Sequence, residues 1–352
     1  MDTVRASAPQ LQGMKPYDPK YLPADVMISA NENPLDVPAD IRREIERQIR
    51  KVPLNRYPDP LANAVRDLIA EANGLDRNQV LLGNGGDELL FDMALAWGGP
   101  GRTFLNMPPT FSVYAANARL TNTQVIDVPR RANFDIDEQA VLECLANNDI
   151  DYTIVNRPNN PTGNTVDPEF IVRILHATDA LVMVDEAYFE FSHDTMRPLL
   201  NQHENLIILR TFSKAFSLAG VRLGYVLASP SVIDELGKVR QPYSVDALSQ
   251  AVARVVYANR ALFVPGIEAI KAERARVLER LRALPGIEAF PSEANYILFR
   301  IAGASQLWQR LYDAGVLIRD FSATPRLEDC LRVSIGTEQE NDRFLATLES
   351  LL

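Results

Sequence analysis

The sequence holds few of the residues that build metal sites and disulfides. Its 352 residues include two cysteines, Cys144 and Cys330, both in segments of apolar periodicity. We expect them to be buried free thiols and the chain to work in a reducing compartment, the cytoplasm. The three histidines lack the spacing of metal ligands, so we expect no histidine-based metal site. They are His176, His193 and His203.

Long apolar runs and an excess of positive charge are missing as well. No stretch approaches the roughly 18 apolar residues that a membrane-spanning helix needs, and residues 1–12 lack the pattern of a signal peptide. The net charge is -10, from 36 basic and 46 acidic residues. This balance argues against nucleic acid or an anionic membrane surface as a bulk partner, but it leaves room for a local basic pocket.

Lysine is scarce, with six lysines against thirty arginines. Lys214 stands out because its neighbours in the run Thr-Phe-Ser-Lys-Ala-Phe, residues 211–216, are small or apolar. A partly buried amine loses its proton and attacks a carbonyl carbon to form a Schiff base, which a guanidinium does not do. A lysine at a strand end also extends its charged tip into water, and Lys214 taken alone fits either interpretation.

Hydrophobic periodicity predicts an α/β fold with two domains. Seven β-rich runs alternate with helical patterns, which indicates a large domain whose mostly parallel seven-stranded sheet is flanked by helices. The runs are residues 80–82, 103–106, 124–128, 152–155, 181–184, 206–210 and 222–228. Helices are expected over residues 39–51, 61–73, 87–97, 137–146 and 169–177.

The pattern changes after Pro242. Long helical stretches over residues 247–258 and 262–284 lead into a smaller α+β region, with strands at 296–300, 316–318 and 331–334 and helices at 305–313 and 338–351. We therefore expect an N-terminal arm over residues 1–33 and a large domain over residues 34–242. An interdomain helix and a small C-terminal domain would occupy residues 243–352.

Polar residues follow several predicted strands at the ends where open parallel sheets bind ligands. Asp185 ends one apolar run, and Tyr188 follows three residues later. Asn160 lies in a proline-rich loop, residues 158–163. The glycine-rich run 83–89 leaves a strand and opens a helix, where backbone amides favour an anion. It lacks the Gly-x-Gly-x-x-Gly and P-loop patterns, so a nucleotide site is the weaker interpretation. Each segment alone also fits a turn or a helix start.

These motifs occur in one order along the chain: residues 31–34, 56–59, 83–89, 158–163, 185–188, 213–214 and Arg222. The succession resembles the fold-type I, class I/II aminotransferases that use pyridoxal 5′-phosphate, and most of all the histidinol-phosphate aminotransferase family. It covers essentially the whole chain. The resemblance implies a transferase of histidine biosynthesis that moves an amino group between L-histidinol phosphate and 2-oxoglutarate or glutamate by ping-pong chemistry. It also implies a homodimer with shared active sites.

The resemblance further implies roles at the cofactor ring. Lys214 would form a Schiff base with the cofactor aldehyde and then shuttle a proton. Asp185 would pair with the pyridinium nitrogen and so make the ring an electron sink. Tyr188 and Asn160 would hydrogen-bond the ring oxygen. Phe111, in preference to Tyr114, would stack on the ring, with a core aromatic as the alternative for Phe111.

The cofactor phosphate and the substrate have their own implied residues. The phosphate would be held by Thr211, Ser213, Arg222, the backbone amides of Gly85, Gly86 and Asp87, and Tyr57 of the neighbouring subunit. Anionic substrates would be held by Tyr17, Asn33, Arg319 and Arg332. For Arg319, a structural ion pair with the adjacent Asp320 is the alternative. Arg332 would bind a carboxylate or phosphate with both arms of its guanidinium.

The chain departs from the family pattern at two places. Gly86 stands where many relatives carry serine, and residues 35–38, Leu-Asp-Val-Pro, replace a common Phe-Gly near the substrate entrance. Alternatives within the fold are an aromatic amino-acid aminotransferase and a phosphothreonine decarboxylase, which share the cofactor motifs. A remote alternative is a sensor that binds pyridoxal phosphate without turnover. Such sensors usually carry a DNA-binding domain, for which this acidic chain has no candidate segment.

Overall fold

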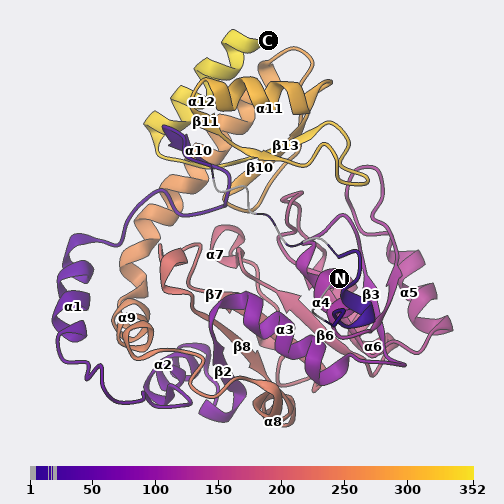
Figure 1. Cartoon of the computed structure of the whole chain (residues 1–352), viewed down its shortest axis with the longest axis vertical. Coiled ribbons are helices and arrows are strands. Elements are labelled where there is room, and N and C mark those ends of the chain that lie inside the picture. The colour runs from indigo at the N-terminus through magenta and orange to yellow at the C-terminus, as the bar shows by residue number, and fades with distance from the viewer. Residues whose placement is uncertain (1–4, 15, 17, 19–21) are drawn as a thin grey trace.

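The computed structural model describes residues 5–14, 16, 18 and 22–352 of the chain. It divides into a large lower region around a wide sheet and a smaller upper region near the C-terminus, joined by a long helix (Figure 1). The helices of the large region are α1 (Ala39–Ile49), α2 (Asn63–Asn73), α3 (Gly85–Trp97), α4 (Val113–Leu120), α5 (Glu138–Asn147), α6 (Pro168–Ala177), α7 (Phe189–Ser192), α8 (Pro230–Val239) and α9 (Ala247–Ala258).

The large sheet has seven strands in the order β2-β8-β7-β6-β5-β3-β4. Their bounds are β2 (Val80–Gly83), β3 (Thr103–Asn106), β4 (Gln124–Asp127), β5 (Tyr152–Asn156), β6 (Leu181–Asp185), β7 (Leu206–Thr211) and β8 (Gly224–Ala228). All neighbours are parallel except β8, which is antiparallel to both β2 and β7. The predicted seven strands and the mostly parallel sheet are confirmed.

Alternation along β6 explains why the sheet is covered on both faces. Val182 and Val184 belong to one buried cluster, whereas Leu181 and Met183 belong to the other, because successive strand residues point to opposite faces. The second face is covered by α3, α4 and α8, whose buried residues join the same cluster. At the carboxyl edge, Asn156 of β5 pairs in register with Asp185 of β6, so the polar strand ends lie side by side.

The small domain is built on a four-stranded antiparallel sheet, in the order β12-β13-β10-β9. These strands are β9 (Glu288–Ala289), β10 (Tyr296–Arg300), β12 (Arg319–Asp320) and β13 (Cys330–Ser334), and the helices beside them are α11 (Ala304–Asp313) and α12 (Glu338–Leu351). The long helix α10 (Val264–Ala283) runs up from the large region to this domain (Figure 1).

A short strand near the N-terminus belongs to the small domain in space. β1 (Val26–Met27) pairs in parallel with β11 (Val316–Leu317), and Figure 1 shows its indigo arrow beside the C-terminal elements. The chain then passes down to α1, and on this path residues 29–33 cross between the two domains. We call these five residues the strap.

Some predicted boundaries of helices and strands are wrong, and some helices were not predicted. The expected strand over residues 222–228 begins only at Gly224, because Arg222 adopts a left-handed backbone conformation (φ 56°) that a strand does not accommodate. The helix expected from Asp87 begins at Gly85. Helices α4, α7 and α8 were not predicted. Cys144 and Cys330 are buried free thiols, as expected. Among the described residues, no helix is long and apolar enough to cross a membrane.

Candidate active site

A cavity of ≈ 620 Å³ opens at the carboxyl ends of the central strands. Its large-domain wall comes from α3, α4 and the ends of β5, β6 and β7, and its opposite wall comes from the strap, Arg319 and Arg332. The residues from the sequence motifs that line it are Gly86, Asp87, Phe111, Asn160, Asp185, Tyr188, Thr211, Ser213, Lys214, Arg222, Arg319 and Arg332. Segments up to 300 residues apart in the sequence therefore meet at one site.

Lys214 lies on the loop after β7 and reaches across to the strap. Its Nζ donates a hydrogen bond to the carbonyl of Ala30 at 3.2 Å and lies 5.9 Å from the centre of the Tyr188 ring. Burial of the ammonium group lowers the pKa of Lys214 to about 8, and the positive charge of Arg332 acts in the same direction. A pKa of about 8 leaves part of the amine without its proton near neutral pH, and the deprotonated form is the nucleophile for a carbonyl carbon.

Asp185 is held at the end of β6 by two donors. Its Oδ2 accepts a hydrogen bond from the hydroxyl of Tyr114 at 2.5 Å, and its Oδ1 accepts one from the backbone amide of Ala187 at 3.0 Å. Burial raises the pKa of Asp185 to about 6, although the Tyr114 hydrogen bond opposes this rise. The group is therefore an anion at neutral pH, in a position where a cationic partner would relieve the cost of its burial.

The opposite corner of the cavity suits an anion. The first turn of α3 carries Gly85 and Gly86, and the N-cap residue makes no side-chain cap hydrogen bond to its amides. Arg222 stands beside them and pairs with Asp87 at 3.1 Å. A Cβ on Gly85, where φ is +82°, would lie 2.7 Å from Nη2 of Arg222, and a Cβ on Gly224 would lie 2.7 Å from the amide nitrogen of Gly86. Glycine at these points lets backbone amides and guanidinium share one small space.

A second cationic corner lies on the small-domain side. Arg319 and Arg332 are directly opposite each other in the antiparallel pair of β12 and β13, an arrangement of like charges that is unfavourable by itself. Arg332 is buried and donates to Oδ1 of Asn160 at 2.6 Å and to the carbonyl of Ser29 at 2.8 Å. Arg319 donates to the carbonyl of Asp18.

Aromatic rings bound the space between the two cationic corners. Phe111 lines the cavity and meets Tyr114 edge to face at 5.6 Å. Tyr114 is almost fully buried, and its hydroxyl donates a hydrogen bond to Asp185. Phe111 is only partly buried. This arrangement favours Phe111 as the residue that faces a bound ring, which stays a prediction.

Among the described residues, three of the expected site residues do not line this cavity: Tyr57, Asn33 and Gly85. Tyr57 is 81% exposed and stacks on Tyr243 at 4.5 Å. The side chain of Asn33 bonds the carbonyl of Ala215 and the amide of Leu35. Tyr17 lies outside the described residues. Gly85 is not in the cavity wall, although it packs against Arg222.

Sequence reasoning missed two buried residues of the site, Tyr114 as a partner of Asp185 and Asn31 as a partner of Tyr188. Tyr114 was considered only for stacking, and its spacing on α4 offers no sign that it reaches β6. The amide of Asn31 donates to the Tyr188 hydroxyl at 2.9 Å. Asn31 belongs to the motif of residues 31–34, but nothing in that motif indicates its partner Tyr188, which is 157 positions away in the chain.

Comparisons with known proteins show the family to which the chain belongs. Residues 25–348 match the family model for aminotransferase class I and II. The chain is 38% identical to the histidinol-phosphate aminotransferase of Chlorobaculum tepidum over 93% of this chain and 94% of that protein. Among solved structures, the histidinol-phosphate aminotransferase of Sinorhizobium meliloti in complex with pyridoxal-5′-phosphate superposes with a TM-score of 0.91, at 22% identity, over 99% of this chain and 98% of that one. The L-threonine-O-3-phosphate decarboxylase of Porphyromonas gingivalis gives 0.81, at 25% identity, over 92% and 98%.

The chain therefore belongs to the class I and II aminotransferases, with the fold-type I architecture that its motifs predicted. Within that class it is a member of the histidinol-phosphate aminotransferase family, as the resemblance of the motifs indicated.

Proposed function

We propose that this chain is a pyridoxal phosphate-dependent transaminase that moves an amino group between L-histidinol phosphate and 2-oxoglutarate or glutamate. The observation that carries the proposal is the cavity itself. It presents one amine of lowered pKa, one buried carboxylate and two cationic corners, at the edge of a parallel sheet.

The residues present fit pyridoxal phosphate as a cofactor. The first turn of α3 and Arg222 suit a phosphate group, and Gly85 and Gly224 leave space that a Cβ would fill. Asp185, a buried anion, suits a protonated ring nitrogen, and Lys214 suits the aldehyde. When bound, the cofactor supplies an electron sink that makes a hydrogen on the adjoining substrate carbon acidic.

The protein's own residues then have separate tasks. Lys214 holds the cofactor and moves a proton, because with a pKa of about 8 its amine accepts and returns a proton near neutral pH. Asp185 keeps its negative charge beside the ring nitrogen, and Tyr114 holds its carboxylate in place. Tyr188 and Asn160 would donate to the ring oxygen, and Thr211 and Ser213 would hold the phosphate together with Arg222.

The second cationic corner supports anionic substrates. Arg319 and Arg332 face each other across two strands, and a carboxylate or phosphate between them would relieve their repulsion. Both substrates of the proposed reaction carry such a group, histidinol phosphate at its phosphate and 2-oxoglutarate at its two carboxylates. Two substrates that share one recognition group suit a ping-pong reaction at one site. Tyr17 and Asn33 are proposed to complete this corner on substrate binding.

We infer a homodimer in which Tyr57 serves the neighbouring site. Tyr57, Leu54 and Tyr243 are exposed to 81%, 81% and 40% on the chain alone, and apolar exposure of this size in one area is typical of an interface. The position of Tyr57 outside the cavity of its own chain, on such a surface, supports this role. The buried free thiols are compatible with a cytoplasmic location.

The test is a panel of amino donors added one at a time to the protein loaded with pyridoxal phosphate. Histidinol phosphate, phenylalanine, tyrosine, glutamate and phosphothreonine are compared by the rate at which the visible absorbance of the cofactor changes, with carbon dioxide release measured in parallel. Histidinol phosphate and glutamate are expected to react fastest, without carbon dioxide. Fastest reaction of phosphothreonine with release of carbon dioxide would replace the proposal with a decarboxylase. Faster reaction of phenylalanine or tyrosine would replace it with an aromatic aminotransferase.

A further inference from the structure

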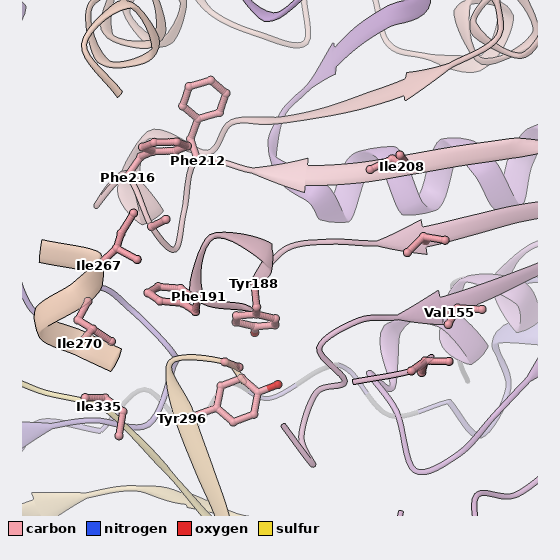
Figure 2. Close-up of a cluster of buried hydrophobic side chains, with 14 of the residues drawn as sticks. Val155, Tyr188, Phe191, Ile208, Phe212, Phe216, Ile267, Ile270, Tyr296 and Ile335 are labelled. Carbon is pink, nitrogen blue, oxygen red and sulfur yellow. The ribbon is translucent and has the colours of Figure 1, made fainter. Parts of the chain in front are cut away.

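Tyr188 contacts the small domain although it belongs to the large one. It follows β6 in the chain, and its ring meets Tyr296 of β10 edge to face at 5.1 Å. Figure 2 shows the two rings next to each other, one from each domain. Its hydroxyl oxygen accepts a hydrogen bond from the side-chain amide of Asn31 in the strap. The orientation of this phenol therefore depends on residues outside its own domain.

Asn31 has a partner for each of its four polar atoms. Its backbone N–H donates to Oγ of Ser334 at 2.8 Å, and that hydroxyl donates back to Oδ1 of Asn31 at 3.1 Å. Its carbonyl accepts from the side chain of Asn295 at 3.0 Å, and its Nδ2 donates to Tyr188. The side chain is 1% exposed, and the backbone is left-handed with φ 55°, a conformation that asparagine tolerates better than most residues.

Ser334 determines which way the Asn31 amide points. Because the Ser334 hydroxyl donates to Oδ1, the NH₂ group must face the other way, toward Tyr188. Ser334 lies on β13 two residues after Arg332, so both side chains are on the same face of that strand. The substrate arginine and the residue that orients Asn31 therefore move together with one strand.

The other strap residues repeat this bridging. The carbonyl of Ser29 binds Arg332, the carbonyl of Ala30 binds Lys214, and the side chain of Asn33 binds the carbonyl of Ala215. Asn31 joins a hydroxyl of the small domain, that of Ser334, to Tyr188, a side chain proposed to contact the cofactor ring.

We propose that Asn31 is a positioning residue for Tyr188, oriented by Ser334, through which the small domain sets the hydrogen bond that Tyr188 makes to the cofactor ring. An amide that donates to the phenol oxygen makes the phenol proton a stronger donor. Stronger donation to the ring oxygen favours the form of the Lys214–cofactor group that has lost its proton, and so lowers the pKa of that group. The inference rests on the proposed function only in requiring that the protein bind pyridoxal phosphate.

The experiment is a pH titration of the visible absorbance of the loaded protein, without substrate. Tyr188→Phe removes the phenol hydroxyl itself, so its change in the midpoint of the titration is the largest that the variants of Asn31 and Ser334 could cause. Asn31→Gly removes the side chain while keeping a residue that accepts positive φ, and it is expected to raise the midpoint by about one pH unit, the equivalent of one hydrogen bond. Ser334→Ala is expected to raise the midpoint by less. The Asn31 amide remains in this variant, but it has lost the hydrogen bond that holds it in one orientation. The double variant is expected to match Asn31→Gly, since Ser334 acts through Asn31.

Two controls separate positioning from general damage. Asn122→Gly makes the same change at an exposed residue of equal backbone conformation, φ 61°. Asn341→Ala removes a fully buried asparagine of α12 that bonds Glu273 on α10 and the carbonyl of Gly336, away from the cavity. Both are expected to leave the midpoint of the titration unchanged, whatever they do to the melting temperature.

The outcomes distinguish the inference from the proposed function. If the unmodified protein shows no visible absorbance band after it is mixed with pyridoxal phosphate, the cofactor assignment itself is refuted. A normal band whose midpoint moves in Tyr188→Phe but not in Asn31→Gly or Ser334→Ala would overturn the role of Asn31. A band unmoved in Tyr188→Phe would overturn it as well. If Asn31→Gly fails to fold, a midpoint in Ser334→Ala equal to that of the unmodified protein would be decisive against the proposal.

Discussion

The two walls of the cavity are built in different ways. The large-domain wall, which we call the floor, consists of Asp185, Lys214 and their neighbours at strand ends and of the first turn of α3. Its contacts are set by one sheet whose strands hold one another in register. The opposite wall, the mouth, consists of the strap, Arg319 and Arg332. Its contacts join segments about 300 residues apart and cross between domains.

This difference suggests a division of labour. A rigid floor suits the cofactor, whose reactive atoms must be held in one geometry. A mouth built across a domain boundary suits substrates that enter and leave, because a small shift between the domains would change its width. Variants of the floor are therefore expected to change cofactor affinity and kcat, and variants of the mouth to change KM.

Asp185→Asn should have the largest effect among single changes of the floor short of removing Lys214. A neutral amide cannot pair with a charged ring nitrogen, so we expect kcat to fall on the order of 10²- to 10³-fold. Steady-state kinetics with the best amino donor measure this. Asp92→Asn is the control, since Asp92 is another buried carboxylate of raised pKa, on α3 and outside the cavity wall. Equal kcat in the Asp185 variant and the unmodified protein would show that Asp185 does not pair with the ring nitrogen of the cofactor.

The same carboxylate should destabilise the protein when cofactor is absent. Asp185 has a raised pKa of about 6 in the folded chain, whereas the unfolded chain loses this proton near pH 4. Between these values only the folded state keeps the proton, so the free energy of unfolding falls as pH rises through this window, by about 3 kcal/mol. Cofactor-free Asp185→Asn should therefore gain about that stability over the unmodified protein at pH 7. The gain should shrink toward zero near pH 4.

Urea unfolding of both cofactor-free proteins at the two pH values measures this difference. An equal gap between them at pH 4 and pH 7 would mean that Asp185 carries no raised pKa.

Arg332→Ala tests the mouth. The loss of a charge-assisted contact should raise KM for histidinol phosphate and for 2-oxoglutarate by about 10- to 100-fold, while the affinity for the cofactor, which Arg332 affects only through Asn160 and Lys214, changes much less. Arg332→Lys should give an intermediate KM, because lysine keeps the charge but not the two-armed geometry. The control is Arg300→Ala, on the neighbouring strand β10, which removes an arginine paired with Glu288 away from the cavity. Loss of cofactor affinity together with an unchanged KM would reverse the division between floor and mouth.

Tyr114→Phe should have the smallest effect of this group, through Asp185. Without the hydroxyl, the pKa of Asp185 rises further, since that hydrogen bond lowers it. We expect the dissociation constant of pyridoxal phosphate to rise about tenfold, and more at pH 6 than at pH 8. Equilibrium dialysis at both pH values measures it. Tyr152→Phe, which changes a buried tyrosine of β5 outside the cavity wall, should have no such pH-dependent effect.

The same contrast explains what could be predicted from the sequence. Asp185 ends an apolar strand run, Lys214 lies on the loop that follows another, and Gly85 and Gly86 open a helix, so local patterns identified the floor. The contacts of the mouth are not local. Nothing near Asn31 indicates that it meets Ser334, and nothing near Arg319 indicates that it lies opposite Arg332 rather than pairing with Asp320. Those depend on the packing of β12 and β13 against the strap, which periodicity does not report. Tyr57 remains a prediction because its role requires a second chain.

The central claim is that Lys214 is the residue that holds the cofactor. Reduction of the loaded protein with borohydride converts a Schiff base into a stable bond, and peptide mass spectrometry then identifies the lysine that carries the cofactor. The chain provides its own controls in Lys15, Lys20, Lys51, Lys238 and Lys271. We predict stoichiometric labelling of Lys214 and none of the other five. Labelling of another lysine with Lys214 unmodified, or no labelling at all, would contradict the account.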